Sequence, residues 1–478
     1  MVVKTFQPYV DIMQPPSEVT GSFILNEVKL PTTTVKFSVD CGLFQEKNYE
    51  LENDKFIVSP DSLDFVALTH NHVDHNGRLP YLVRHGFSGS IYTTNVTKAI
   101  LGLSLDDNVR VLKRRFRESK MEYDFNDVAN TLDLVVGCDF NQYVDASEHI
   151  RLYFNMNGHL FGAATVLAEI HYPRTTNTYI LYSGDYNNKN MFFYVSPLRK
   201  WITELPINVV IESTYGTMNS RDIKKVFSEN VTSALEDDKT IVLPVFSLGR
   251  AQEILYVLKR MQMEGLIDVN IPIYYDGKLS FDYTNAITKM QEDGMLHFYE
   301  DKIDFMPENV TKIRDPIARG RVINDHNPKI IVTTSGNGSY GSAQIYIKEL
   351  IQRRNVLIHF TGFCTEDSLG YELKATPKME TVWVCGAKVL KLADVEFTSE
   401  FSAHAKADEL IGFLRQFKDL RSVLVTHGTM GSKDAFAERI VKEVKCKDVG
   451  ILGKGYAYRI NSQGLEKAIP TTLSTPLE

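Results

Sequence analysis

Short hydrophobic runs separated by polar turns dominate the first 215 residues of the chain. Most of these runs are rich in β-branched and aromatic residues and end at Gly, Pro, Asn or Asp, which is typical of β-strands. They occupy residues 35–40, 64–69, 90–94, 149–157, 165–172, 178–185 and 207–213. A longer stretch, residues 96–120, has a helical pattern. We therefore predict a mostly β scaffold over residues 1–215.

The pattern changes after residue 215 to alternating helices and strands. Strands are predicted over residues 240–245, 271–276, 329–334 and 355–361. Between the first two, apolar side chains recur on one helical face from Ala251 to Met261, and Gly265 follows as a stop signal. Such alternation favours a parallel α/β domain, here residues 216–377.

Strands return from about residue 378, and two helix–strand units follow, at residues 405–427 and 433–452. The simplest arrangement is an α/β domain inserted into a β scaffold that resumes over residues 378–465. Residues 466–478 have the pattern of a frayed tail.

The composition is that of a globular protein with a full core. Apolar residues make up 43% and charged residues 24% of 478 residues. No apolar run approaches the roughly 18 residues of a membrane span, and the N-terminus lacks the apolar block of a secretory signal. The five cysteines are dispersed, without the spacing of a disulfide or zinc-ribbon framework. We therefore expect a cytoplasmic protein with no membrane partner.

The net charge of −7 opposes binding of a polyanion. A nucleic-acid partner would therefore need local positive charge, from bound metal ions or a lined groove.

The strongest chemical signal is a histidine cluster directly after the predicted strand at residues 64–69. His70, His72, Asp74 and His75 fall within six positions. His70 and His72 alternate on an extended segment, so both imidazoles point the same way and can share one metal ion. Asp74 and His75 follow the bend and can serve a second ion. The mixture of nitrogen and oxygen donors favours zinc over calcium or magnesium.

Three further candidate ligands lie where other predicted strands end, beside glycines. They are His159, Asp185 and His427. A carboxylate can join two metal ions, which an imidazole cannot easily do. Each position taken alone is more often a capping or core residue than a ligand. Their common context favours a metal site.

These residues resemble the motifs of the metallo-β-lactamase superfamily and, within it, of the β-CASP nucleases. Asp40, the histidine cluster, His159 and Asp185 match the first four motifs in order. Glu212, His404 and His427 match three β-CASP motifs. The resemblance implies an α/β fold, an αββα sandwich with an inserted α/β β-CASP domain. The branch that it most resembles is that of the compact bacterial relatives of the pre-mRNA 3′-end-processing endonuclease.

The resemblance also implies roles for these residues. Two Zn²⁺ ions per chain are expected, one held by His70, His72 and His159 and the other by Asp74, His75 and His427, with Asp185 between them. The positive charge of the two ions would exceed the negative charge of Asp74 and Asp185. The site could therefore attract phosphate although the whole chain has a net charge of −7. His404 is the expected general acid, and Asp40 and Glu212 are expected to orient the imidazoles.

A glycine-rich segment, Ser335, Gly336, Asn337 and Gly338, lies between a predicted strand and a helix. A dinucleotide site would need an acidic residue at the end of the next strand, and residues 355–361 supply none. We expect this segment to contact phosphate at the substrate end, because a helix N-terminus binds anions.

The function expected from the resemblance is cleavage of single-stranded RNA, most simply at internal bonds, and a homodimer is usual in the family. A 5′-exoribonuclease of the RNase J type, a DNA nuclease and a small-molecule metallo-hydrolase are the alternatives. A catalytically inactive scaffold is disfavoured because every ligand position is filled.

Overall fold

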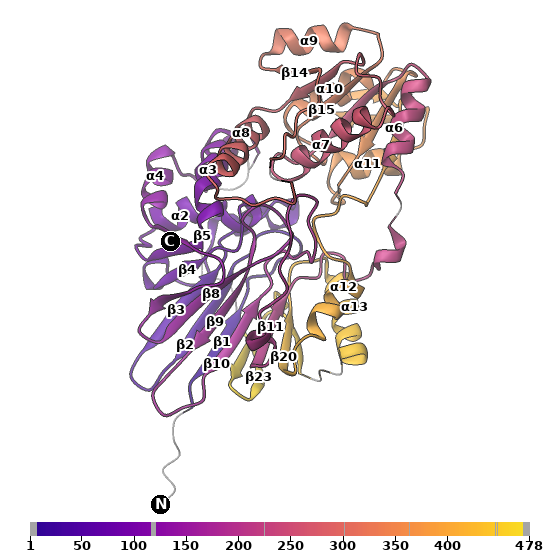
Figure 1. Ribbon diagram of the computed structural model, residues 1–478. Helices are drawn as coiled ribbons and strands as arrows, with labels where there is room; N and C mark the ends of the chain where they lie inside the picture. Colours follow the sequence, from indigo (N-terminus) through magenta and orange to yellow (C-terminus); the bar gives the residue numbers. More distant parts are fainter. Residues whose placement is uncertain are drawn as a thin grey trace, which may run out of the picture. The chain divides into compact units, whose positions relative to one another are not determined.

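The computed structural model describes residues 7–115, 121–223, 225–300, 302–362, 364–444, 446 and 448–471. The chain divides into two compact units (Figure 1). The first unit consists of the residues up to Ser220 together with those from Ala403 onwards, and the second consists of Arg221–Ser402.

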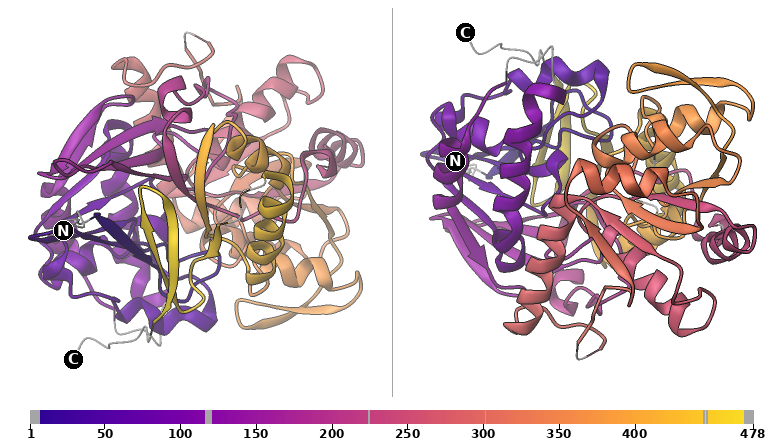
Figure 2. Two further views of the ribbon diagram at one scale, coloured as in Figure 1. Left: turned by 90° about the horizontal axis from the view of Figure 1, so that it is seen from below. Right: turned by 90° about the horizontal axis from the view of Figure 1, so that it is seen from above.

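The first unit is built on two sheets. One has eight strands in the order β23-β22-β1-β2-β3-β4-β5-β6. These are β1 (Tyr9–Met13), β2 (Ile24–Lys29), β3 (Thr34–Val39), β4 (Phe65–Ala67), β5 (Ser90–Thr94), β6 (Val135–Cys138), β22 (Tyr456–Asn461) and β23 (Gly464–Pro470). Strands from the two ends of the sequence are neighbours in this sheet. β1 pairs with β22 in antiparallel register, with Ile12 opposite Tyr458 (Figure 2, left).

The other sheet has seven strands in the order β21-β20-β11-β10-β9-β8-β7. These are β7 (Tyr143–Ser147), β8 (Ile150–Met156), β9 (Ala164–Ile170), β10 (Thr178–Tyr182), β11 (Pro206–Ile211), β20 (Asp419–Val425) and β21 (Val449–Ile451). Strands β10, β11, β20 and β21 run parallel to one another, so their carboxyl ends lie at the same edge of the sheet.

The two sheets face each other across one hydrophobic core. Phe37 and Val28 of the first sheet are buried with Phe154 and Val166 of the second. Helices cover the outer face of each sheet, which gives the αββα layers that the resemblance implied. The helices of the first unit are α1 (Val73–Asn76), α2 (Leu79–Arg84), α3 (Asn95–Arg115), α4 (Phe125–Asp133), α5 (Lys200–Thr203), α12 (Ala407–Leu414) and α13 (Met430–Arg439).

The second unit is a parallel α/β domain. Its six-stranded sheet has the order β14-β13-β15-β12-β16-β19, and every pair is parallel. The strands are β12 (Thr240–Pro244), β13 (Ile273–Asp276), β14 (Val310–Ile313), β15 (Lys329–Thr333), β16 (Val356–Phe360) and β19 (Asp394–Phe397). A separate hairpin joins β17 (Thr381–Val384) to β18 (Ala387–Leu390).

Helices lie on both faces of this sheet, as buried side chains on each side show. They are α6 (Phe227–Glu236), α7 (Arg250–Met263), α8 (Lys278–Glu292), α9 (Pro316–Asn324), α10 (Gly341–Leu350) and α11 (Leu369–Ala375). A parallel sheet requires such crossover helices, which is why the alternating pattern was visible in the sequence.

Two expected boundaries need correction. Residues 378–402 were expected to belong to the resumed scaffold, but they lie in the second unit, because β19 extends its parallel sheet alongside β16. The expected tail from residue 466 overlaps β23, which pairs with β22 as far as Pro470. Residues 472–478 lie outside the described residues.

Among the described residues, no helix is both long enough and apolar enough to cross a membrane.

Candidate metal centre

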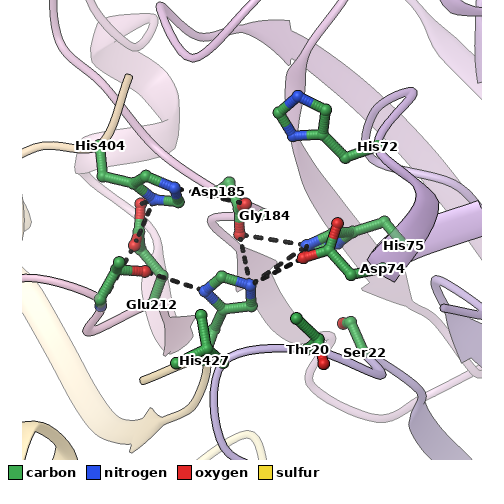
Figure 3. A network of polar contacts seen from close by, with 12 residues as sticks. Thr20, Ser22, His72, Asp74, His75, Gly184, Asp185, Glu212, His404 and His427 are labelled. Atoms are coloured by element: carbon green, nitrogen blue, oxygen red, sulfur yellow. Dashed lines mark hydrogen bonds and ion pairs between the residues drawn. The ribbon is translucent and has the colours of Figure 1, made fainter. Parts of the chain in front are cut away.

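The candidate ligands of the first unit meet because they follow strand ends at one edge of the sandwich. Asp40 follows β3, and His70 lies three residues after β4. Asp185, Glu212 and His427 follow β10, β11 and β20, the parallel strands of the second sheet. In Figure 3 Asp185 lies centrally, within reach of other labelled side chains from distant parts of the chain.

The first group of donor atoms comes from His70, His72, His159 and Asp185. Nδ1 of His72 lies 3.2 Å from Nε2 of His70 and 3.0 Å from Nε2 of His159. Oδ2 of Asp185 lies 3.7 Å from Nε2 of His70 and 3.6 Å from Nε2 of His159. Four donors therefore surround one small volume.

The second group comes from Asp74, His75, Asp185 and His427. Nε2 of His75 lies 3.4 Å from Nε2 of His427. Oδ1 of Asp185 lies 3.3 Å from each of these two nitrogens, and Oδ2 of Asp74 lies 3.7 and 3.6 Å from them. Asp185 thus presents one oxygen to each group.

The donors fit a pair of metal ions. A tetrahedral zinc ion with bonds of about 2.0–2.2 Å requires neighbouring donor atoms roughly 3.3–3.6 Å apart, close to the separations in both groups. Within the described residues, buried Oδ1 of Asp185 makes no hydrogen bond of good geometry and faces only the Nε2 atoms of His75 and His427, each 3.3 Å away. A buried carboxylate oxygen without a donor is costly unless a cation neutralises it. The donor chemistry and the spacing therefore agree with two bound ions.

The ring nitrogens that face away from the donor groups are held by other side chains or by the backbone. Nδ1 of His75 lies 2.6 Å from Oδ2 of Asp40, and Nδ1 of His70 lies 3.0 Å from Oγ1 of Thr69. Nδ1 of His159 lies 3.0 Å from the carbonyl oxygen of Ala403. Such contacts fix the tautomer and leave Nε2 free to bind metal.

His427 is held in the same way, by Oγ1 of Thr214 at 2.9 Å from its Nδ1. Sequence reasoning did not assign roles to Thr69 and Thr214. Thr69 directly precedes His70, and Thr214 lies two positions after Glu212. Their closeness to predicted site residues is the signal that could have identified them.

Asp40 does more than contact His75. Its backbone is left-handed, with φ of 64°, a conformation that aspartate tolerates better than most residues. Its Oδ1 accepts hydrogen bonds from the backbone N–H and the hydroxyl of Thr69, at 2.8 and 3.0 Å. The carboxylate therefore links the end of β3 to two histidines of the cluster, His70 through Thr69 and His75 directly.

The protonation states suit metal binding at the first group. Burial lowers the pKa of His72 to about 4, and it lowers the pKa of both His70 and His159 well below the usual range. Neutral imidazole is the form that binds metal.

The two candidate acidic ligands are held in their ionised form. Burial alone would raise the pKa of Asp185, but nearby histidines, His427 foremost, outweigh it and hold that pKa well below its usual range. The same balance lowers the pKa of Asp74 to about 2, chiefly through His75.

Burial alone would also lower the pKa of His75, but three carboxylates, that of Asp185 foremost, raise it well above the usual range. Without a metal ion this histidine is therefore cationic, and a bound ion would take the place of its Nε2 proton.

His404 and Glu212 form a neighbouring pair. Nδ1 of His404 lies 2.9 and 3.0 Å from the two carboxylate oxygens of Glu212, and its Nε2 lies 3.8 Å from Oδ2 of Asp185. Glu212 also accepts a hydrogen bond from the backbone N–H of Tyr186 at 2.6 Å. Burial alone would lower the pKa of His404, but Glu212 and Asp185 raise it.

A third possible donor group combines Glu212 and His404 with Asp185 and His427. We favour the two groups described above, because Glu212 already accepts hydrogen bonds and its contact with His404 occupies Nδ1 of that ring.

The segment that holds His404 is fixed on both sides. The backbone N–H of Ala405 donates to the carbonyl of Tyr186 at 2.7 Å, and that of Ala407 donates to the carbonyl of Met218 at 2.8 Å. The buried ammonium of Lys406 lies 3.4 Å from the ring centroid of Tyr215. Sequence reasoning missed this cation–π contact, because nothing in the local pattern distinguishes Lys406 from a surface lysine.

The glycine-rich segment belongs to the second unit. Ser335, Gly336, Asn337 and Gly338 lie between β15 and α10. Oδ1 of Asn337 accepts hydrogen bonds from Oγ of Ser335 at 3.0 Å and from the backbone N–H of Ser339 at 3.1 Å. The predicted phosphate contact stays a prediction.

Comparison with protein families gives three matches along the chain. Residues 39–138 match the metallo-beta-lactamase superfamily, residues 251–373 match the Beta-Casp domain, and residues 390–451 match a Zn-dependent metallo-hydrolase RNA specificity domain.

Individual relatives align over most of the chain. A ribonuclease from Thermus thermophilus is 30% identical over 419 residues, which is 86% of this chain and 91% of the ribonuclease. An RNase J-like protein from Methanocaldococcus jannaschii is 27% identical, over 87% of this chain and 93% of its own length. Cleavage and polyadenylation specificity factor subunit 3-I from Arabidopsis thaliana is 28% identical over 81% of this chain, which spans about half (54%) of the plant protein.

Proposed function

Because the chain belongs to the β-CASP branch of the metallo-β-lactamase superfamily, we propose that it is a metal-dependent ribonuclease that hydrolyses phosphodiester bonds of single-stranded RNA. The observation that supports this function most directly is the pair of donor groups joined by Asp185. Relatives named as ribonucleases support RNA as the substrate.

We assign the metal as zinc, with two ions per chain. His70, His72 and His159 would hold one ion, and Asp74, His75 and His427 the other, with one oxygen of Asp185 for each. The nitrogen-rich donor set and the tetrahedral spacing support zinc over magnesium, which prefers six oxygen ligands. When bound, such a pair supplies Lewis-acid polarisation of a phosphate and of an attacking water.

The remaining roles belong to side chains of this chain. His404, held at Nδ1 by Glu212, presents Nε2 toward Asp185 and would deliver a proton from Nε2 to the departing oxygen of the RNA. Glu212 keeps the ring in that orientation and favours its protonated form. Asp40 keeps Nε2 of His75 directed at the second donor group.

Internal cleavage is the mode that we propose, on the strength of the motifs shared with the 3′-end-processing endonucleases. The test is a time course on end-labelled single-stranded RNA with metal and with chelator. Products of intermediate length, absent with chelator, are expected. Mononucleotides alone would assign the chain to the 5′-exonuclease mode, and cleavage of DNA alone would contradict the proposed substrate. A homodimer stays a prediction, to be tested by light scattering.

A further inference from the structure

Phe246 holds an unusual place in the second unit. It lies two residues after β12, the strand that pairs with β15 on one side and β16 on the other. Its ring is therefore at the carboxyl edge of a parallel sheet, between the segments that follow the two flanking strands. Ligands of open parallel α/β sheets characteristically bind at this edge.

Glycines on both flanking segments make room for the ring. A Cβ atom on Gly336, after β15, would lie 2.6 Å from the ring of Phe246, and one on Gly362, after β16, would lie 2.9 Å from it. Both separations are too short for real carbon contacts, so any larger residue at either position would displace the ring. The ring thus packs against the backbone on either side.

The backbone that supports Phe246 is also fixed. The N–H of Val245 donates to the carbonyl of Thr333 at 2.8 Å, and the carbonyl of Phe246 accepts from the N–H of Ala251 at 3.0 Å. The buried guanidinium of Arg250 donates to the carbonyl of Thr361, beside Gly362. The aromatic ring is consequently held on a supported turn at the entry to α7.

Despite this support, Phe246 is 40% exposed. A residue needed only to fill space between Gly336 and Gly362 would be expected to bury its ring more completely. A supported aromatic surface open to solvent is suited to stacking against another flat ring, a contact that every nucleobase can make. It also provides affinity without positive charge, which matters in a chain of net charge −7.

We propose that the exposed surface of Phe246 stacks against a nucleobase of the RNA, as a contact that does not depend on base identity. This proposal rests on the proposed ribonuclease function and adds a binding contact in the second unit, apart from the donor groups of the first.

The test compares binding of two fluorescent oligomers to the full chain in chelator, where the RNA is not cut. One is single-stranded RNA, and the other has the same ribose–phosphate backbone with abasic units. Native protein should bind the RNA about ten-fold or more tightly than the abasic oligomer, since stacking is worth roughly 1–3 kcal/mol per base. Phe246→Leu should lose most of this preference, and Phe246→Tyr, which retains the ring, should keep it.

Trp383→Leu is the matched control, because Trp383 is a 61% exposed aromatic residue of the same unit, on β17. It should leave the preference unchanged. An unchanged preference in a folded Phe246→Leu protein would overturn the proposal, as would an equal loss in Trp383→Leu.

Photocross-linking of native protein to RNA that contains 5-iodouridine gives a readout that does not depend on the folding of a variant. A cross-linked peptide that contains Phe246 would support stacking, and cross-links confined to other peptides would overturn it. Cleavage of RNA by the metal-loaded native chain is measured in parallel. Cleavage of RNA by a native protein that binds RNA and the abasic oligomer equally would defeat the stacking proposal alone, whereas absence of both cleavage and RNA binding would defeat the proposed function as well.

Discussion

Nδ1 of His404 lies 2.9 Å from Oε2 of Glu212, so a histidine just before α12 is tied to the carboxylate that follows β11. The two residues are 192 positions apart in the sequence. Neither is needed in the two donor groups that meet at Asp185. The His404–Glu212 pair is therefore separate from the candidate metal ligands, and its role can be tested without removing any of them.

His404→Ala should reduce kcat by roughly 10²- to 10⁴-fold, the usual range for a general acid, while metal content is retained. Glu212→Gln should cost less, and the double variant should be no slower than His404→Ala alone, because Glu212 acts through the histidine. Single-turnover rates and metal analysis on the same samples test this. Glu204→Gln, an exposed glutamate paired with Lys418, is the control. Additive losses in the double variant would contradict the assigned pairing.

Asp40→Asn should weaken metal binding by about 10- to 100-fold, because it removes the charge that orients and polarises His75. The measurement is zinc affinity by competition with a chromophoric chelator. Asp133→Asn, at the exposed end of α4, should bind zinc as native protein does. Native affinity in a folded Asp40→Asn protein would show that the contact of 2.6 Å to His75 has no bearing on the metal.

Asp185→Asn should lower the number of tightly bound zinc ions below two per chain, because an amide offers one weak oxygen donor in place of a carboxylate that faces both groups. Mass spectrometry of the intact protein under native conditions would count the ions. Two tightly bound ions in this variant would refute the bridging assignment.

Burial of Lys433 leads us to expect that the stability of the protein depends on pH in the alkaline range. Its side chain is fully buried and donates to the carbonyl of Ser17 at 2.8 Å, and burial lowers its pKa from 10.5 to about 8. Between pH 8 and 10.5 the unfolded chain therefore binds more protons at this site than the folded chain. The free energy of unfolding should rise with pH across that window, by up to about 3 kcal/mol from this group.

The comparison that isolates this effect is urea unfolding of native protein and Lys433→Met at pH 7.5, 9 and 10.5, in chelator throughout. The stability of the native protein relative to the variant should increase with pH. Lys442→Met, at an exposed lysine, should follow the native protein at each pH. A constant difference between native protein and Lys433→Met would contradict the lowered pKa.

The hydrophobic pattern of the sequence predicted much of this architecture, but only where the pattern was clear within a single short segment. The strand at residues 90–94 coincides with β5, and the helix at Ala251–Met261 lies within α7. Strand β23 escaped notice because most of its residues are at least partly exposed, and β1 because it is short and pairs with β22, a partner distant in sequence. The end of the inserted domain was misplaced for the same reason, since β19 is assigned only by its pairing with β16.

In the candidate site, the proposed ligands could be predicted from the sequence but the contacts that orient them could not. The histidine cluster was evident because four donor residues fall within six positions, and the other candidates emerged from strand ends and from family resemblance. The contacts that orient them, such as Thr214 to His427 and Lys406 over Tyr215, were not evident. They depend on side-chain directions that only the packed sandwich fixes.

The dependence of RNA cleavage on two bound zinc ions is tested most directly by a zinc titration of metal-free protein, in which bound zinc and the rate of RNA cleavage are measured on the same samples. No cleavage is expected without metal, and full activity is expected when two ions are bound per chain. Full cleavage by the metal-free protein, or a chain with two bound zinc ions that leaves single-stranded RNA intact, would contradict this dependence.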